Sequence, residues 1–419
     1  MRPDLLARLG ERLAARAAEH GLRRLVAATR GNGTLVVDGR ALVDFSGNDY
    51  LGLAGHAAVR DALVACAIRD GVGAGAAHLI GGHRPEHAAL EAEAAAWLGC
   101  ERALLFSTGY AANLGVFQTL LGPDDLVVQD KLDHASLIDA AKLAGCEAKR
   151  YVHGDVESAR RQLRSRPDAA ALVATDGVFS MDGDLAPLAA LAALARDTGA
   201  ALMVDDAHGA GVLGPEGRGS AAHAGLAPSD VDVHVVTLGK ALGVAGALVA
   251  GSQALIEGLV QFARTWVYTT AMPPALAAAT RAALAVARHE DWRRDRLARL
   301  VAHFRRGAAA RGIALMPSTT PIQPLPAGSA ERALAWSHAL AAAGFHVPAI
   351  RPPTVADGAA RLRITLSVRH DERTIDTLLD ALAAATAAPA EPRTEPAART
   401  RGRTGTRVRG GPASHRARS

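Results

Sequence analysis

Two stretches decide the fold of this chain: residues 201–209, ALMVDDAHG, and residues 233–243, VHVVTLGKALG. Each is a short apolar run that ends in polar residues or glycine, as a buried strand does where it enters a loop. RALLFSTGYAANLGVF, DLVVQDKLDHASL and ALVATDGVFSMDG repeat this pattern, and intervening segments such as LAPLAALAALARDTG have helical periodicity. This alternation predicts α/β units on a mainly parallel sheet, whose ligands collect at the carboxyl ends of the strands.

The 419 residues are too many for one compact core and predict several domains. We expect an N-terminal helix and arm over residues 1–50 and a large cofactor-binding domain over 51–290. From about residue 291 two helical stretches flank HVPAIRPPTV and ARLRITLSV, which predicts a smaller α+β domain ending near residue 387. Residues 388–419 form a separate tail.

The composition indicates in which cellular compartment the protein works and which partners it can bind. The three cysteines form no CxxC pair, so the sequence supports neither a disulfide framework nor a metal site. No stretch reads as a signal peptide or membrane span, and we expect a cytoplasmic protein without membrane contact. The tail carries eight arginines and two glutamates and almost no large apolar residue. It therefore predicts a disordered appendage, and binding of RNA, DNA or another anion is the alternative.

Lysine is rare in this chain. Only four of the 47 cationic residues are lysine, so the choice of lysine at position 240, among apolar neighbours, needs a chemical reason. Asp205 ends the preceding apolar run, about one βαβ unit earlier. An acid beneath a ring nitrogen and an amine able to form an imine are what pyridoxal 5′-phosphate (PLP) requires, and a guanidinium cannot replace the amine. The competing interpretation is an aspartate that caps a helix and a satisfied histidine at position 208.

A phosphate seat is the second candidate feature. In FSTGYAANLG a strand runs through Gly109 and Tyr110 into a helix start, where free backbone N–H groups favour an anion. The alternative is that these residues form an ordinary strand-to-helix turn that binds no phosphate. GVGAG at residues 71–75 follows no clear strand, and we reject it as a dinucleotide fingerprint.

These motifs resemble a known family over about residues 20–385. The chain is similar to the α-oxoamine synthases, which are fold-type I PLP enzymes, and most similar to the branch that serves biotin synthesis. The resemblance is carried by GNDYLGL, LDHASLIDAA, GVFSMDGDLAPL, MVDDAHGAGVLGPEGRGS, VVTLGKALG, YTTAMPPA and AIRPPTVADGAARLRITL. It implies a PLP-dependent transferase fold, with a large domain of mainly parallel sheet flanked by helices and a smaller α+β domain.

The resemblance also implies roles for single residues in cofactor binding. Lys240 would be the Schiff-base lysine, Asp205 the partner of the ring nitrogen, and His208 a contact to the phenolic oxygen. His134 would stack on the ring. The remaining cofactor contacts would be Gly109, Tyr110 and Thr237 at the phosphate, Ser180 against the cofactor, and Thr269 and Thr270 reaching the phosphate from the second subunit of a homodimer.

The implied reaction is a decarboxylative condensation of L-alanine with pimeloyl-CoA or a pimeloyl-acyl carrier protein. Arg23 would meet the acyl substrate, with Arg24 as the alternative, Arg351 the amino acid carboxylate, and Thr354 the substrate. A sister enzyme such as glycine C-acetyltransferase is the alternative, because Asp176 stands where the biotin branch often has glutamate. A nucleic-acid-binding regulator that keeps a PLP domain is a third hypothesis, and it rests on the tail alone.

Overall fold

The computed structural model describes residues 2–18, 21–23, 25–31 and 33–387. The tail, the subject of the predictions of disorder and of anion binding, lies outside the described residues, as does Arg24. The described helices include none that is long and apolar enough to cross a bilayer.

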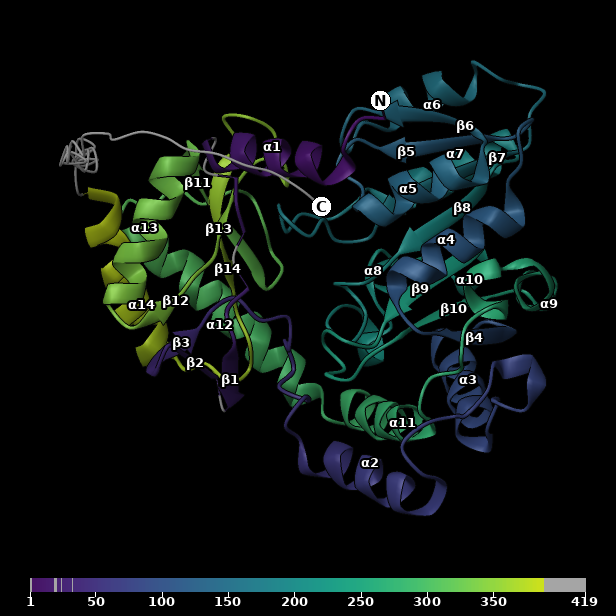
Figure 1. The fold of residues 1–419 in the computed structure, drawn as a ribbon, viewed down its shortest axis with the longest axis horizontal. Coiled ribbons are helices and arrows are strands. Elements are labelled where there is room, and N and C mark those ends of the chain that lie inside the picture. The colour runs from purple at the N-terminus through teal and green to yellow at the C-terminus, as the bar shows by residue number, and fades with distance from the viewer. Residues whose placement is uncertain (1, 19–20, 24, 32, 388–419) are drawn as a thin grey trace, which may run out of the picture. The chain divides into compact units, whose positions relative to one another are not determined.

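The largest sheet has seven strands in the order β4-β10-β9-β8-β7-β5-β6 (Figure 1). The neighbours β9, β8, β7, β5 and β6 are parallel, whereas β10 runs antiparallel to both β9 and β4. The mainly parallel sheet predicted from the sequence is therefore confirmed. The strands are β4 (Arg102–Phe106), β5 (Leu126–Asp130), β6 (Glu147–Tyr151), β7 (Ala171–Asp176), β8 (Ala201–Asp205), β9 (Val233–Thr237) and β10 (Ala247–Gly251).

Helices cover both faces of this sheet, which explains why all of its strands except the edge strand β6 are apolar runs. Successive residues of a strand point to opposite faces: Val127 packs in one core cluster, and its neighbours Leu126 and Val128 pack in another. The helices of this part are α2 (Ala57–Asp70), α3 (Pro85–Leu98), α4 (Gly109–Leu120), α5 (Ala135–Ala144), α6 (Val156–Leu163), α7 (Leu188–Thr198), α8 (Ser220–His223), α9 (Gln253–Phe262), α10 (Arg264–Val267) and α11 (Pro274–His289), with 3-10 turns η1 (His78–Ile80), η2 (Pro215–Gly217) and η3 (Pro228–Asp230).

The N-terminal arm and the C-terminal residues form two smaller sheets, one of which contains strands from both. One has the order β1-β2-β3-β12, so a strand from the C-terminal region pairs in parallel with the arm; the other has the order β11-β14-β13. Their strands are β1 (Ala28–Gly31), β2 (Thr34–Val37), β3 (Arg40–Asp44), β11 (Ile322–Gly328), β12 (Phe345–His346), β13 (Ala349–Ile350) and β14 (Ala360–Thr365). The helices α12 (Asp291–Ala310), α13 (Ala330–Ala342) and α14 (Glu372–Ala387) accompany them. The arm and the C-terminal region thus share a sheet, and the domain bounds given above stay a prediction.

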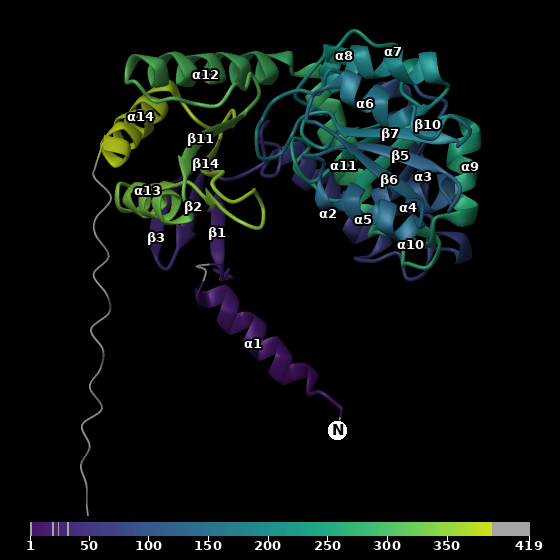
Figure 2. The same ribbon diagram turned by 90° about the horizontal axis from the view of Figure 1, so that it is seen from above.

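The first helix, α1 (Leu5–Ala18), has the apolar stripe that the sequence predicts but no buried residue. Figure 2 shows it extending away from β1, β2 and β3. Its leucines are therefore exposed in this chain.

Candidate active site

A cavity of about 240 Å³ lies at the carboxyl ends of the parallel strands. The parallel strands all end at the same edge of the sheet, and their following loops begin there. Residues far apart in the sequence therefore meet at this edge. Eight of the predicted site residues line the cavity, and four lining residues had no predicted role in binding. The predicted ones are Gly109, Tyr110, His134, Ser180, Asp205, His208, Thr237 and Lys240, and the others are Ser136, Asp176, Val178 and Ala207.

One end of the cavity is the start of α4, the predicted phosphate seat. The hydroxyl of Thr108 accepts a hydrogen bond from the Ala111 N–H at 3.0 Å and caps the helix, so the first-turn N–H groups lie at the helix end. A Cβ at Gly109 would lie 2.8 Å from the methyl carbon of Thr237. A side chain at this position would enter the seat, which explains glycine here and fits a bound phosphate.

Asp205 is buried and held in one orientation. Its Oδ2 accepts from Nδ2 of Asn113 at 2.7 Å, and its Oδ1 accepts from the Ala207 N–H at 3.1 Å. Asn113 also donates to the hydroxyl of Ser136 at 2.8 Å. Sequence reasoning missed Asn113, although its place one turn along α4 from Gly109 was the available signal. A carboxylate fixed by such donors suits a partner for a protonated ring nitrogen.

The side chain of Lys240 places an amine in the same cavity, and among the described residues this amine makes neither a hydrogen bond nor an ion pair. Burial lowers the pKa of the amine, and the carboxylates of Asp205 and Asp176 partly oppose this shift. A lysine with a lowered pKa is a better nucleophile and base near neutral pH. An unpartnered amine beside a fixed acid is therefore what the carbonyl and ring of PLP would require.

Two neutral histidines complete the cavity wall. Burial lowers the pKa of both His134 and His208, so the imidazoles are uncharged near neutral pH. Nδ1 of His134 is 2.7 Å from the hydroxyl of Ser136, and Nδ1 of His208 is 2.7 Å from the hydroxyl of Tyr50. Each ring is thus held through one nitrogen. Tyr50 lies in the GNDYLGL motif, but no role was predicted for it.

Arg363, on β14, is a buried cation that sequence reasoning missed. Its Nε donates to the carbonyl of Ser180 at 2.6 Å, and its Nη atoms lie 3.3 Å from Oδ1 of Asn48. Since Ser180 lines the cavity, the guanidinium lies directly behind the cavity wall. The motif ARLRITL contains this residue, but only the fold shows which of its arginines is next to the site.

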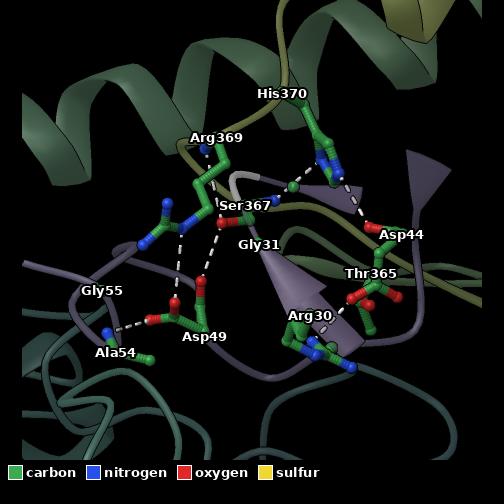
Figure 3. Close-up of a pocket in the computed structure, with 12 residues that line it drawn as sticks. Arg30, Gly31, Asp44, Asp49, Ala54, Gly55, Thr365, Ser367, Arg369 and His370 are labelled. Carbon is green, nitrogen blue, oxygen red and sulfur yellow. Dashed lines mark hydrogen bonds and ion pairs between the residues drawn. The ribbon is translucent and has the colours of Figure 1, made fainter. Parts of the chain in front are cut away.

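A second cavity, of about 300 Å³, is lined by Asp44 and Asp49 from the N-terminal arm and by Arg369 from the C-terminal region (Figure 3). Its arginines are paired: Arg30 with Asp44 at 2.6 Å, and Arg369 with Asp49 at 3.4 Å. Arg369 also donates to the Gly52 carbonyl at 2.8 Å. With both cations neutralised, the cavity does not fit an anion, and we interpret its ion pairs as supports for the segment that contains Asp44 and Asp49.

Five predicted site residues do not line the first cavity. Arg23 donates to the hydroxyl of Thr354 at 2.8 Å, and Arg351 donates to the Leu22 carbonyl at 2.9 Å, so these three form a group of their own. Thr269 and Thr270 follow α10, and Thr270 forms a β-bridge with Ala77. Their predicted roles stay predictions.

Histidines gather near this bridge in a group that the sequence did not predict. His78, His83 and His87 place one ring nitrogen each within 4.8 Å of one another, as metal ligands can. Nδ1 of His87, however, accepts from the Arg84 N–H at 2.9 Å, and its Nε2 is 2.8 Å from the Met272 carbonyl. Both nitrogens of His87 are therefore in use, and we interpret the group as hydrogen-bonded packing.

Comparison with known proteins agrees with this geometry. The family model described as aminotransferase class I and II matches residues 40–382. A curated 8-amino-7-oxononanoate synthase of Xanthomonas axonopodis pv. citri is 53% identical over 383 residues, which is 91% of this chain and 96% of that relative. The synthase of the same name from Alkalilimnicola ehrlichii is 54% identical over 376 residues, covering 89% and 96%.

Solved structures of related enzymes also superpose on this chain. A serine palmitoyltransferase of S. paucimobilis with a PLP adduct bound superposes with a TM-score of 0.86 at 28% identity, covering 91% of this chain and 98% of that chain. An 8-amino-7-oxononanoate synthase of Francisella tularensis superposes with a TM-score of 0.73 at 30% identity, covering 82% and 98%.

Proposed function

Because the chain belongs to the aminotransferase class I and II family and, within it, to the 8-amino-7-oxononanoate synthases, we propose that it condenses L-alanine with a pimeloyl thioester. It is a PLP-dependent C-acyltransferase of biotin biosynthesis. The identity of 53% over 91% of the chain carries the proposal, and the cavity with Lys240 and Asp205 supplies its chemistry. We further propose that it works in the cytoplasm as a homodimer.

Each residue of the cavity would bind a different part of the cofactor, according to its position. PLP, when bound, supplies a carbonyl for the Lys240 amine and an electron-withdrawing ring for the amino acid. Gly109, Tyr110 and Thr237 would hold its phosphate, and Asp205 its ring nitrogen. The His134 imidazole would lie on the ring, and Nε2 of His208, whose Nδ1 already contacts Tyr50, would be left for the phenolic oxygen.

Lys240 is the base of this proposal. Burial lowers the pKa of its amine and so makes Nζ a better base, which can take the proton from Cα of the bound amino acid and return one later. General-base catalysis of this kind contributes about 10²–10⁴-fold. Ser180 lies at the cavity wall and would limit the space open to the substrate.

The substrates bring two carboxylates, one on alanine and one at the far end of the pimeloyl chain. Arg363 lies against the cavity wall and is the nearer cation for the alanine carboxylate, the role predicted for Arg351. Arg23, Arg351 and Thr354 are then available to the acyl substrate. Replacing Arg363 with Lys should raise the KM for alanine, and replacing Arg351 with Ala should raise the KM for the thioester. The opposite assignment reverses these two results.

The remaining site residues act between subunits in this proposal. Thr269 and Thr270 would reach the phosphate of the partner's cofactor, which would explain why they do not line the cavity of their own chain. Sedimentation of the loaded enzyme tests the dimer. Mixing Lys240→Ala and Thr270→Val chains tests the sharing, because only mixed dimers would then contain one complete site.

A substrate panel tests the proposed reaction. Purified enzyme is given L-alanine or glycine with pimeloyl-CoA, acetyl-CoA or a pimeloyl-acyl carrier protein, and thiol release and product mass are recorded. We expect the fastest turnover with L-alanine and a pimeloyl thioester. Faster turnover of acetyl-CoA with glycine would favour glycine C-acetyltransferase instead.

A further inference from the structure

Two acids end neighbouring strands at the edge of the cavity. Asp176 ends β7 and Asp205 ends β8, and the two are Cα partners in the parallel pair. Asp133, just beyond β5, lies behind them, and all three side chains are at most 5% exposed. Among the described residues, Lys240 is the one cation that lines the cavity, and the guanidinium of Arg363 lies behind the cavity wall. Two cations beside three buried carboxylates leave an excess of negative charge, which favours a proton retained among the acids.

The hydrogen bonds indicate which carboxyl holds this proton. Asp133 accepts on both oxygens, from the N–H of Asp176 and from the N–H of Asp130, each at 3.0 Å. Asp205 likewise accepts two hydrogen bonds, from Asn113 and Ala207. Hydrogen bonds accepted on both oxygens favour the ionised forms of Asp133 and Asp205. Asp176 is left as the carboxyl that can carry a hydrogen.

The charges around Asp176 agree with this assignment. Burial raises the pKa of Asp176, the charge of Asp205 raises it further, and Lys240 and the His134 N–H partly oppose the shift. Burial likewise raises the pKa of Asp133, which Asp176 and Asp130 raise further. Nδ1 of His153 lies 3.0 Å from Oδ1 of Asp130, so His153 pairs with Asp130, and Lys240 is the cation whose charge opposes the shift at Asp176.

We propose that Asp176 enters the reaction as a carboxylic acid and gives its proton to the sulfur that leaves the pimeloyl thioester. This inference rests on the proposed function and adds a catalytic residue to it. Nζ of Lys240 takes the Cα proton of alanine, and Cα bonds to the thioester carbonyl carbon. The C–S bond then breaks with its electron pair on sulfur, and the Asp176 proton converts the thiolate to a thiol.

The protons balance over the whole catalytic cycle. After loss of CO2, the ammonium of Lys240 returns a proton to Cα. Asp176 regains its proton from solvent, which supplies the one proton that the condensation consumes. No oxidant or further reactant is needed.

The test compares the native holoenzyme with Asp176→Asn, which keeps the shape of a neutral acid but has no acidic proton. With pimeloyl-CoA the variant should lose about 10²-fold or more in kcat while keeping its cofactor absorbance and its unfolding midpoint. With the pimeloyl ester of an aryl thiol, whose thiolate leaves without a proton, the loss should shrink to a few-fold. An equal loss with both thioesters, or no loss with either, would overturn the proposal.

An infrared measurement on the native enzyme needs no variant. A protonated carboxyl should give a C=O band at pH 7 that shifts in D2O and is missing from Asp176→Asn. Absence of that band from the native enzyme would refute the proposal even if the variant failed to fold. If the native enzyme showed the band but released no thiol from pimeloyl-CoA with L-alanine, the proposed function would fail instead, and the two failures are thus distinguished.

Discussion

Replacing Gly219 with Ala should destabilise this protein because it sets a methyl group against the buried carboxylate of Asp206. Gly219 has φ 99° and ψ −168°, a conformation open almost only to glycine. A Cβ built there would lie 1.8 Å from Oδ2 of Asp206, the oxygen that accepts from the Ser220 N–H at 2.6 Å. The carboxylate is 2% exposed and cannot move into solvent.

The magnitude follows from two contributions. A non-glycine residue in this backbone conformation costs about 1–3 kcal/mol. Displacing buried atoms to admit the methyl group costs about 1–3 kcal/mol more. We therefore expect Gly219→Ala to lower the free energy of unfolding by about 2–6 kcal/mol. Because Asp206 is the neighbour of Asp205, cofactor affinity should fall as well.

Urea unfolding of matched variants measures this cost. Gly225, at the other end of α8, also has a positive φ, of 75°, but a Cβ there would meet nothing within 4 Å. Gly225→Ala should therefore cost only the backbone part, about 1–2 kcal/mol. In an Asp206→Ala background the excess cost of Gly219→Ala should largely disappear. Equal costs for the two glycine variants would refute the steric reasoning.

Three further predictions concern ionisable and hydroxyl groups. Lys240→Ala should abolish the visible absorbance of covalently held cofactor and lower turnover by at least about 10²-fold; a variant that kept both would show that the lysine assignment is wrong. Tyr50→Phe removes the hydroxyl that contacts Nδ1 of His208 at 2.7 Å, and urea unfolding should show a loss of about 1 kcal/mol, whereas an unchanged midpoint would contradict that contact. Two carboxylates raise the pKa of His153 to about 10, so its stabilising effect is complete below pH 6.5 and lost as the pH rises from 6.5 to 10. The side chain is 29% exposed, and after a discount for solvent screening we expect a loss of about 2 kcal/mol across this range, which His153→Ala should remove.

Much of the large sheet could be predicted from the sequence. The apolar runs ending at Phe106, Asp130, Asp176, Asp205 and Thr237 are the strands β4, β5, β7, β8 and β9. Such runs are buried on both faces, so their composition alone marks them as strands of a covered sheet. The exposed second and fourth residues of β6 fit no such run, and β10 follows β9 too closely for a crossover helix, so neither strand was predicted.

Eight cavity residues could be named from the sequence. Asp205, His208 and Lys240 follow apolar runs whose carboxyl ends share an edge, whereas His134 and Ser180 were named only because the chain resembles a known family. Asn113, Tyr50 and Arg363 could not be assigned in this way. Tyr50 meets His208 across 158 positions, and Arg363 meets Ser180 across 183. Local periodicity carries no information at such separations.

The sequence by itself therefore determined the strand ends, the reactive amine and the acid opposite it, because each is written within one α/β unit. Only the tertiary structure decided which buried groups support them and which carboxyl is left with a proton. The protonation and orientation of these groups depend on hydrogen-bond donors, charges and burial that come from several segments far apart in the sequence. These segments meet only when the chain has folded.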